Sequence, residues 1–297
     1  MCGRYATTRS AADLSQLFES YDETGGRLDA DYNVAPTDPV PIVRMSASAG
    51  ATDDRAAAAD DHAGLAGGRA GVVGGRAGVA GDRAAGAGAD TADERPGDQG
   101  DAPATRRRAL SVARWGLVPA WAKDARGGAR MINARAETVA TTNAYARSFA
   151  KRRCLVPADG WYEWVRGDGG TKQPYFMTPA DGGVLALAGL WSVWKGPDGP
   201  LLSCSVITTA AVGELADVHD RMPLLLAPER WDDWLDGGDS AAHLLAPPSA
   251  RMLAGIEIRP VGRGVGDVRN DGPELVARVS APPLRTDPAA PDELTLF

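Results

Sequence analysis

The residue with the clearest chemical potential is Cys2, which follows the initiator methionine. A small residue here normally permits removal of Met1, and Cys2 would then begin the mature chain. Its α-amine, with a reference pKa of about 7.7–8.0, and its thiol, at about 8.5, would form a 1,2-aminothiol. An aldehyde can form a Schiff base with the amine, which the thiol closes to a thiazolidine ring. The thiol could instead act alone as a nucleophile. On its own, a cysteine at position 2 is more often an inert terminal residue.

A carboxylate and an imidazole elsewhere in the chain could move protons. Glu163 lies within Gly160-Trp161-Tyr162-Glu163-Trp164, among three aromatic rings. If its side chain is buried its pKa should rise, which suits a general acid or base. If it lies exposed on an edge strand, the rings face the other way and the carboxylate is ordinary surface. His219 lies in a polar turn, either as a proton carrier or as a hydrogen-bonded structural histidine.

Two short polar segments could contribute binding groups. Asn133 and Arg135 are two residues apart and would share a face if this segment is extended. Arg4, two residues after Cys2, could lower the pKa of the thiol or bind a phosphate.

The elements that must position these residues are predicted to be short strands and a few helices. The predicted strands cover residues 110–115, 153–156, 161–165, 175–177, 184–191, 202–208 and 256–261, with a turn at Pro157-Ala158-Asp159-Gly160. Helices are predicted at 11–19, 143–152 and 228–235. Thr141 or Thr142 is available to cap the second of these, and Pro228 begins the third. Runs of strands with irregularly placed helices predict an α+β domain around a mostly antiparallel sheet.

One internal segment has a very different composition. From Ser46 to about Thr105, more than half of the residues are Ala or Gly, there is no aromatic residue, and the hexapeptide GGRAGV occurs twice. Such a segment buries too little apolar surface to offset the entropy lost on ordering. We therefore expect a disordered insertion at 46–108, in a loop that joins strands 40–44 and 110–115 into a hairpin. A flexible tail is expected at 286–297.

Charge and cysteine content limit the functional class. The formal net charge is −7, so binding to nucleic acid would require a local basic groove. Three widely spaced cysteines favour neither a disulfide framework nor a zinc site; Cys154 and Cys204 are expected to be structural. There is no apolar signal region and no run of about 20 apolar residues. We expect a cytoplasmic protein without a bound metal or cofactor.

Several motifs occur together in a characteristic order. They are MCGRY, Asn33-Val34-Ala35-Pro36, Trp115-Gly116-Leu117-Val118-Pro119-Ala120-Trp121, Ile132-Asn133-Ala134-Arg135-Ala136-Glu137-Thr138, Arg153-Cys154-Leu155-Val156-Pro157-Ala158-Asp159-Gly160-Trp161-Tyr162-Glu163-Trp164 and Val218-His219-Asp220-Arg221-Met222-Pro223. This set resembles the SRAP family of SOS response-associated peptidases, or abasic-site processing proteins. The resemblance covers residues 2–45 and about 110–280, and we therefore expect one SRAP-like domain over 2–285, interrupted by the insertion.

The resemblance implies a fold and a set of site residues. The fold would be a single α+β domain with a barrel-like, mostly antiparallel sheet and flanking helices. The catalytic set would be Cys2, Asn133, Glu163 and His219, in which Asn133 orients the amine and the sugar, Glu163 acts as acid or base, and His219 relays a proton at the sugar hydroxyl. Residues expected at the DNA are Arg4, Pro36, Trp115, Trp121, Arg135, Thr209 and Arg221.

The function implied is the capture of abasic sites in single-stranded DNA, in the DNA damage response. Mature Cys2 would form a stable thiazolidine crosslink, an activity of the crosslinking or lyase type that one monomer could perform, at the nucleoid when the protein is bound to DNA. The alternative is a thiol peptidase that processes its own N-terminus, with Cys2 as nucleophile, Asn133 as orienting group and His219 as base.

Overall fold

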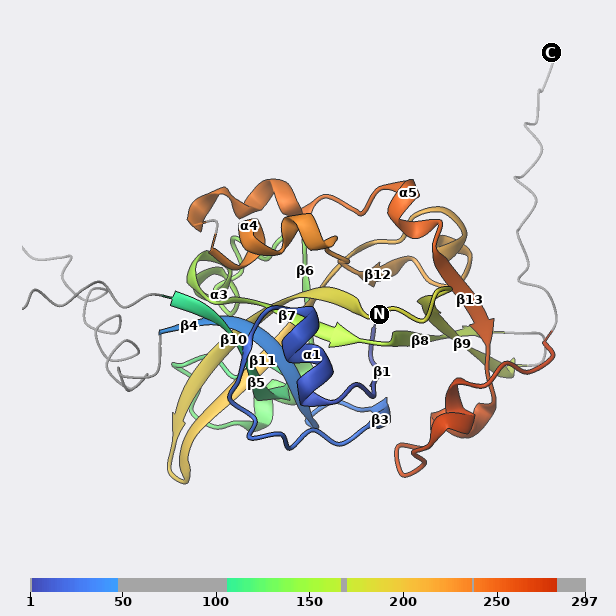
Figure 1. The fold of residues 1–297 in the computed structure, drawn as a ribbon, viewed down its shortest axis with the longest axis horizontal. Coiled ribbons are helices and arrows are strands. Elements are labelled where there is room, and N and C mark those ends of the chain that lie inside the picture. Colours follow the sequence, from blue (N-terminus) through green and yellow to red (C-terminus); the bar gives the residue numbers. More distant parts are fainter. Residues whose placement is uncertain (1, 48–105, 167–169, 237, 282–297) are drawn as a thin grey trace, which may run out of the picture. The chain divides into compact units, whose positions relative to one another are not determined.

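The structure is a computed structural model that describes residues 2–47, 106–166, 170–236 and 238–281. By its backbone contacts the chain divides into two units. The smaller is Ala47–Arg106, and the larger is made of Met1–Ser46 and Arg107–Phe297. The described residues of the larger unit form two sheets with short helices around them (Figure 1). Most of the predicted 46–108 insertion and all of the predicted tail lie outside the described residues.

The first sheet holds the N-terminal strand near its centre. Its five strands follow the order β13-β9-β8-β1-β3, and every pairing between them is antiparallel. They are β1 (Tyr5–Thr7), β3 (Asp31–Val34), β8 (Gly160–Arg166), β9 (Lys172–Pro179) and β13 (Ile256–Pro260). Because β8 lies between β9 and β1, it is an interior strand and the side chain of Glu163 does not lie on a sheet edge.

The second sheet closes on itself. Its order is β12-β11-β10-β7-β4-β5-β2, and β5 also pairs with β11, so that β11, β10, β7, β4 and β5 form a closed ring. The strands are β2 (Tyr21–Asp22), β4 (Pro39–Ala47), β5 (Arg106–Trp115), β6 (Asn133–Arg135), β7 (Arg153–Ala158), β10 (Leu185–Gly196), β11 (Gly199–Ala210) and β12 (Arg221–Pro223). Parallel pairings of β2, β5 and β6 are the exceptions to an otherwise antiparallel sheet. The predicted α+β fold with a barrel-like sheet is confirmed.

Strands β4 and β5 are hydrogen-bonded neighbours, as the hairpin prediction required. They extend beyond the predicted strand ends and take in residues 46–47 and 106–108, which the sequence boundaries had assigned to the insertion. The boundary was misplaced because the change in composition at Ser46 precedes the end of the strand.

The chain changes from the second sheet to the first between β7 and β8. Only Asp159 separates the two strands, so the predicted four-residue turn at Pro157–Gly160 is wrong. Asp159 accepts hydrogen bonds from the backbone N–H and the hydroxyl of Thr8, at 2.7 and 2.6 Å. Gly160 is required here, because a Cβ atom would lie 2.4 Å from the carbonyl oxygen of Met177. Because the chain crosses here, Glu163 on β8 lies in the same sheet as β1.

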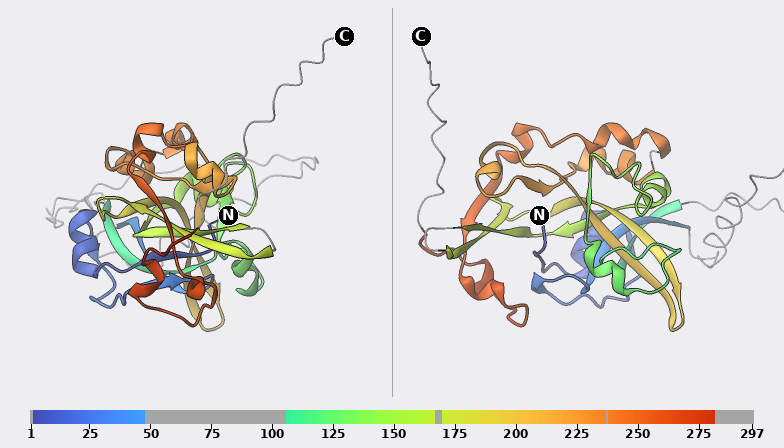
Figure 2. Two further views of the ribbon diagram at one scale, coloured as in Figure 1. Left: turned by 90° about the vertical axis from the view of Figure 1, so that its right-hand side faces the viewer. Right: turned by 180° about the vertical axis from the view of Figure 1, so that it is seen from behind.

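Short helices cover the barrel. They are α1 (Ala11–Leu17), α3 (Ala146–Lys151), α4 (Trp231–Asp236) and α5 (Ala250–Leu253), with a 3-10 turn at Pro228–Arg230 before α4. Ser10 caps α1 by accepting the backbone N–H of Asp13. Helix α3 starts later than predicted, at Ala146, and neither Thr141 nor Thr142 provides a side-chain cap. Helix α4 lies on the same side of the fold as α5 (Figure 2).

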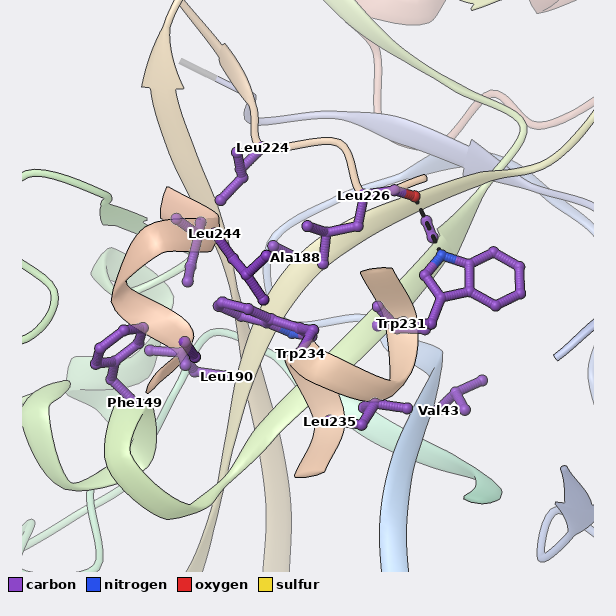
Figure 3. Packing of buried hydrophobic residues seen from close by; sticks show 14 of the residues in the cluster. Val43, Phe149, Ala188, Leu190, Leu224, Leu226, Trp231, Trp234, Leu235 and Leu244 are labelled. Atoms are coloured by element: carbon purple, nitrogen blue, oxygen red, sulfur yellow. Dashed lines mark hydrogen bonds between the residues drawn. The ribbon is translucent and has the colours of Figure 1, made fainter. Parts of the chain in front are cut away.

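Two tryptophans of α4 tie the helix to β7 and to the segment after β12 (Figure 3). Trp231 donates its indole N–H to the carbonyl of Leu226 at 3.1 Å, and Trp234 donates to that of Cys154 at 2.8 Å. Because both of these indole N–H groups have partners, the two large rings are buried without an unsatisfied donor.

A second buried cluster contains Cys2, Tyr5, Trp115, Cys154 and Cys204.

Candidate active site

Cys2 lies three residues before β1, an interior strand of the first sheet, and is fully buried. In the β1–β8 pairing Tyr5 is opposite Trp161, and the backbone N–H of Tyr162 donates to the carbonyl of Arg4 at 2.9 Å. Continuing this antiparallel register places the Cys2–Gly3 segment beside Glu163 and Trp164. The N-terminal residues are thus aligned against the strand that carries the candidate acid.

Asn133 contacts the backbone of Cys2 directly. Its side-chain amide donates to the carbonyl of Cys2 at 2.6 Å. Its amide oxygen is buried and has no hydrogen-bond partner among the described residues. Asn133 starts β6, which pairs with β11 through Val206 opposite Asn133. One end of the side chain therefore binds Cys2, and the other is a buried acceptor without a partner among the described residues.

Glu163 is 5% exposed, which identifies it as the buried carboxylate and excludes the edge-strand alternative. Burial raises the pKa of Glu163, and the nearby charge of His219 opposes that rise. Burial also raises the pKa of the Cys2 thiol, and the negative charge of Glu163 raises it further. These couplings connect Cys2 with Glu163 and Glu163 with His219.

His219 lies between a 3-10 turn at Gly213–Asp217 and β12, with 29% of its side chain exposed. Its Nδ1 atom accepts the backbone N–H of Arg221 at 2.9 Å and lies 2.6 Å from a carboxylate oxygen of Asp220. The first contact requires a lone pair on Nδ1, whereas a hydrogen bond to the carboxylate requires a proton there. The imidazole is consequently held at Nδ1 in either protonation state.

Strand β11 pairs with both short strands next to Asn133 and His219, but at different points along its length: Asn133 is opposite Val206, and Arg221 is opposite Ala210. Thr208 is opposite Arg135 of β6 in one pairing and opposite Pro223 of β12 in the other. Asn133 and His219 lie at or near the ends of these two short strands. The four predicted catalytic residues come from segments that are remote in the sequence. A hydrogen bond joins Asn133 to Cys2, and electrostatic interactions link Cys2 with Glu163 and Glu163 with His219.

The guanidinium of Arg4 points into the protein, contrary to the expectation that it lowers the thiol pKa. It donates to the side-chain oxygen of Asn33 at 2.6 Å and to the carbonyl of Val265 at 2.9 Å, and lies 6.0 Å from the ring of Trp164. Burial raises the pKa of the Cys2 thiol, and a hydrogen bond with the backbone of Arg4 lowers it by a smaller amount.

Two of the residues expected at the DNA are buried. Trp115 is fully buried, donates its indole N–H to the carbonyl of Ile132 at 3.0 Å, and packs edge-on against Tyr5. Thr209 is also buried, within β11. The buried ring of Trp115 has no exposed face on which a base could stack, and the buried side chain of Thr209 is not accessible for the secondary contact expected of it.

The remaining expected DNA contacts differ in availability. Trp121 is 65% exposed, Arg135 is exposed and Pro36 is half-buried. Arg221 donates to both carboxylate oxygens of Glu137 at 3.0 Å and to the carbonyl of Thr208 at 2.6 Å. It is therefore engaged in holding β6, β11 and β12 together, and a DNA contact would compete with that role.

Sequence reasoning missed several residues that support this site. Asn33 was quoted only as part of a motif, although its buried amide donates to the carbonyls of Asp267 and Asn270 at 2.9 and 2.8 Å. Tyr145 was assigned to a helix, yet its hydroxyl donates to the carbonyl of Asn133 at 3.0 Å. Such contacts join segments remote in sequence, and only the motif around Asn33 gave any signal.

Within the described part of the chain, no group of three or more His, Cys, Asp or Glu side chains is placed to hold a metal ion. No helix in these residues is long and apolar enough to cross a membrane.

Comparison with known proteins identifies relatives. The family model for the SOS response associated peptidase (SRAP) matches residues 1–268. The chain is 38% identical over 172 residues to the abasic site processing protein YoqW of Bacillus subtilis, covering 56% of this chain and 75% of the relative. It is 35% identical over 168 residues to YedK of Escherichia coli (56% and 73%) and 32% identical over 209 residues to HMCES of Gallus gallus (61% and 60%), both named abasic site processing proteins.

Solved structures share the fold. A crystal structure of a protein from Bacteroides thetaiotaomicron superposes with a TM-score of 0.63 and 20% sequence identity, covering 94% of this chain and all of the other. One from Bordetella bronchiseptica gives a TM-score of 0.58 and 18% identity, covering 88% of this chain and all of that protein. At these identities the likeness concerns the fold alone.

Proposed function

Because the chain belongs to the SOS response-associated peptidase family, we propose that it binds and processes abasic sites in DNA, the role stated in the names of its relatives. The proposed product is a covalent crosslink between the lesion and mature Cys2. The observation that carries this proposal is the hydrogen bond from Asn133 to the carbonyl of Cys2, beside a buried carboxylate. An inert terminal cysteine would need neither.

The proposed reaction starts at the aldehyde carbon of a ring-opened abasic site. The α-amine of Cys2, exposed by removal of Met1, adds to this carbon and water leaves, which gives a Schiff base. The Cys2 sulfur gives up its proton and adds to the same carbon, and the thiazolidine closes with one hydrogen of the original amine left on the nitrogen. One water is lost in total, and no oxidant or reductant is needed.

Two residues are assigned to the proton transfers. Glu163 gives a proton to the departing hydroxyl and later accepts the thiol proton, because its raised pKa lets it hold a proton closer to neutral pH. His219 relays a proton at the sugar hydroxyl, with its ring oriented through Nδ1. Asn133 orients the amine through its buried oxygen.

The proposed DNA contacts are the exposed ones. Trp121 offers an aromatic face on which an unpaired base can stack, and Arg135 offers a charge for a phosphate. Pro36 is a lesser candidate. We propose single-stranded DNA as the substrate, since a base gap in a single strand exposes the aldehyde without flipping. One site per chain is sufficient, so a monomer can act alone.

A thiol peptidase is the second candidate, favoured by the description of the family and by the presence of Cys2, Asn133 and His219 in one place. Cysteine peptidases need a thiolate, which requires a lowered thiol pKa. At Cys2 burial and Glu163 act in the opposite direction. The crosslinking chemistry, which starts at the amine, is therefore the better supported of the two.

The test compares wild-type protein with Cys2→Ala on single-stranded DNA carrying one abasic site. On a denaturing gel the wild type should form a slower-migrating adduct and Cys2→Ala none, while an unmodified oligonucleotide gives none with either. Equal adduct with Cys2→Ala would refute the proposal. Cleavage of peptides by the wild type but not by Cys2→Ala, without adduct formation, would favour the peptidase.

A further inference from the structure

Strand β6, which carries Asn133, is held by the sheet on one side only. Its sole strand partner among the described residues is β11. The bonds reaching β11 involve alternate residues of the β6 segment: the carbonyl of Ile132 accepts from Val206, and the N–H of Ala136 donates to Thr208, both at 2.9 Å. In a paired strand the intervening residue points its backbone carbonyl to the opposite edge. The carbonyl of Asn133 therefore faces away from β11.

Tyr145 supplies the contact on that open edge. Its hydroxyl donates to the carbonyl of Asn133 at 3.0 Å. Tyr145 itself is fixed by the start of α3, where its N–H donates to Thr142 and its carbonyl accepts from Phe149. The ring of Phe149 lies 6.2 Å from that of Trp234 in the core. The hydroxyl is thus anchored through α3 to the barrel.

We propose that Tyr145 is a positioning residue for the crosslinking reaction, a role that rests on the proposed function. It acts through Asn133, whose backbone it holds and whose side chain holds Cys2 at 2.6 Å. With β11 on one edge and Tyr145 on the other, the tilt of β6 about its own axis is fixed. That tilt sets where the buried oxygen of Asn133 points and how the terminal amine meets the aldehyde.

A hydroxyl is needed for this role, and a phenyl ring is needed for packing. Tyr145 is half-buried and its ring packs against the larger core cluster, together with Met131. Tyr145→Phe keeps the ring and removes only the donor. The matched control is Tyr21→Phe in β2, which removes a hydroxyl that donates to the carboxylate of Glu23 at 2.8 Å.

The experiment measures three quantities for wild type, Tyr145→Phe and Tyr21→Phe. They are the single-turnover rate of adduct formation on abasic single-stranded DNA, the affinity for the same strand with a stable abasic analogue lacking the aldehyde, and the thermal midpoint. Tyr145→Phe should slow adduct formation about tenfold, the scale of losing one positioned hydrogen bond, with unchanged affinity. Tyr21→Phe should react at the wild-type rate.

Two results of the rate, affinity and thermal measurements would overturn the proposal. One is a wild-type rate for Tyr145→Phe. The other is a parallel loss of rate, affinity and thermal midpoint, which would indicate general destabilisation. Hydrogen exchange separates this proposal from the proposed function: the amides of Ala136 and Val206 should exchange at least about fivefold faster in Tyr145→Phe, whether or not DNA is crosslinked. Unchanged exchange would also reject the role of Tyr145, and a wild type that forms no adduct would reject the function alone.

Discussion

Glu163 occupies a position that serves reactivity better than stability. Its carboxylate is nearly excluded from water, and burial raises its pKa above the ordinary value of 4.5. Between 4.5 and the raised value the folded state binds this proton more readily than the unfolded chain does. Stability contributed by Glu163 is therefore present below pH 4.5 and is lost as the pH rises through that window.

Replacing Glu163 with Gln should stabilise the protein and impair its chemistry. At pH 7–8 the free energy of unfolding of Glu163→Gln should exceed that of the wild type by on the order of 1 kcal/mol, and the difference should vanish near pH 4. The adduct should form about 100-fold more slowly, since a proton donor and acceptor is lost. Urea unfolding at several pH values and single-turnover gels measure the two effects.

Glu257 provides a control of opposite sign. Hydrogen bonds from Arg259, with support from Arg278, lower the pKa of Glu257 to about 2. Its stabilisation is present above the ordinary pKa and is lost as the pH falls towards 2. Glu257→Gln should thus destabilise at pH 7 and leave the adduct rate unchanged. A Glu163→Gln variant that is destabilised like Glu257→Gln would contradict the assignment of Glu163 as a buried carboxylate with a raised pKa.

For single residues, the sequence identified the chemically important side chains better than it predicted their surroundings. Glu163 and Asn133 stand out because a charge among aromatic residues and a polar motif are visible locally. The burial of Trp115 and the inward direction of Arg4 are not, because they depend on Ile132, Asn33 and Val265, which lie far away in the chain.

Strands β1 and β3 are joined to the loop after β13 by one buried amide. The side-chain oxygen of Asn33 accepts a hydrogen bond from the guanidinium of Arg4, and its side-chain nitrogen donates to the carbonyls of Asp267 and Asn270. Because Arg4 follows Cys2 by two residues, this contact holds the N-terminal segment against the sheet. A buried group with three partners of this kind stabilises through all of them together.

Asn33→Ala should cost about 2–4 kcal/mol in the free energy of unfolding, because two carbonyls and one guanidinium lose their partner. Chemical denaturation measures this loss. The matched control is Asn270→Ala, whose exposed side chain donates one bond to the carbonyl of Gly264 and should cost less than about 1 kcal/mol. Equal effects of the two variants would show that Asn33 does not hold these strands together.

The sequence predicted most elements but not how they connect. The apolar segments at 184–191 and 202–208 located β10 and β11, and Pro228 marked the start of the 3-10 turn that leads into α4. The crossover from β7 to β8 was read as a turn, because Pro-Ala-Asp-Gly is typical of turns in isolation. What decides otherwise is the pairing of β7 with β10 and of β8 with β9, which lies beyond local sequence.

At the scale of the whole molecule, we expect the fold to tolerate replacement of the segment 48–105. Strands β4 and β5 on either side of it are hydrogen-bonded neighbours, so their ends lie close together and a short turn can join them. Replacing 48–105 by a Gly-containing linker of about six residues should preserve the fold and raise the free energy of unfolding by about 2 kcal/mol through the lower entropy of loop closure. Circular dichroism, thermal unfolding and the adduct assay measure the outcome. A shortened protein that folds but no longer forms the adduct would show that the segment takes part in the reaction.

The claim that the amine and thiol of mature Cys2 act together is tested most directly by intact mass spectrometry. Wild type and Cys2→Ser are incubated with abasic single-stranded DNA and denatured, with and without prior borohydride reduction. Both retain a terminal amine after removal of Met1, but only the wild type has the thiol that closes the ring. The wild type should give, without reductant, a species with the mass of the chain from Cys2 plus the DNA minus one water. Cys2→Ser should give an adduct only after reduction, as expected for an open Schiff base. An unreduced, denaturation-stable adduct of Cys2→Ser in wild-type yield, or a wild-type adduct that retains Met1, would contradict the proposed chemistry.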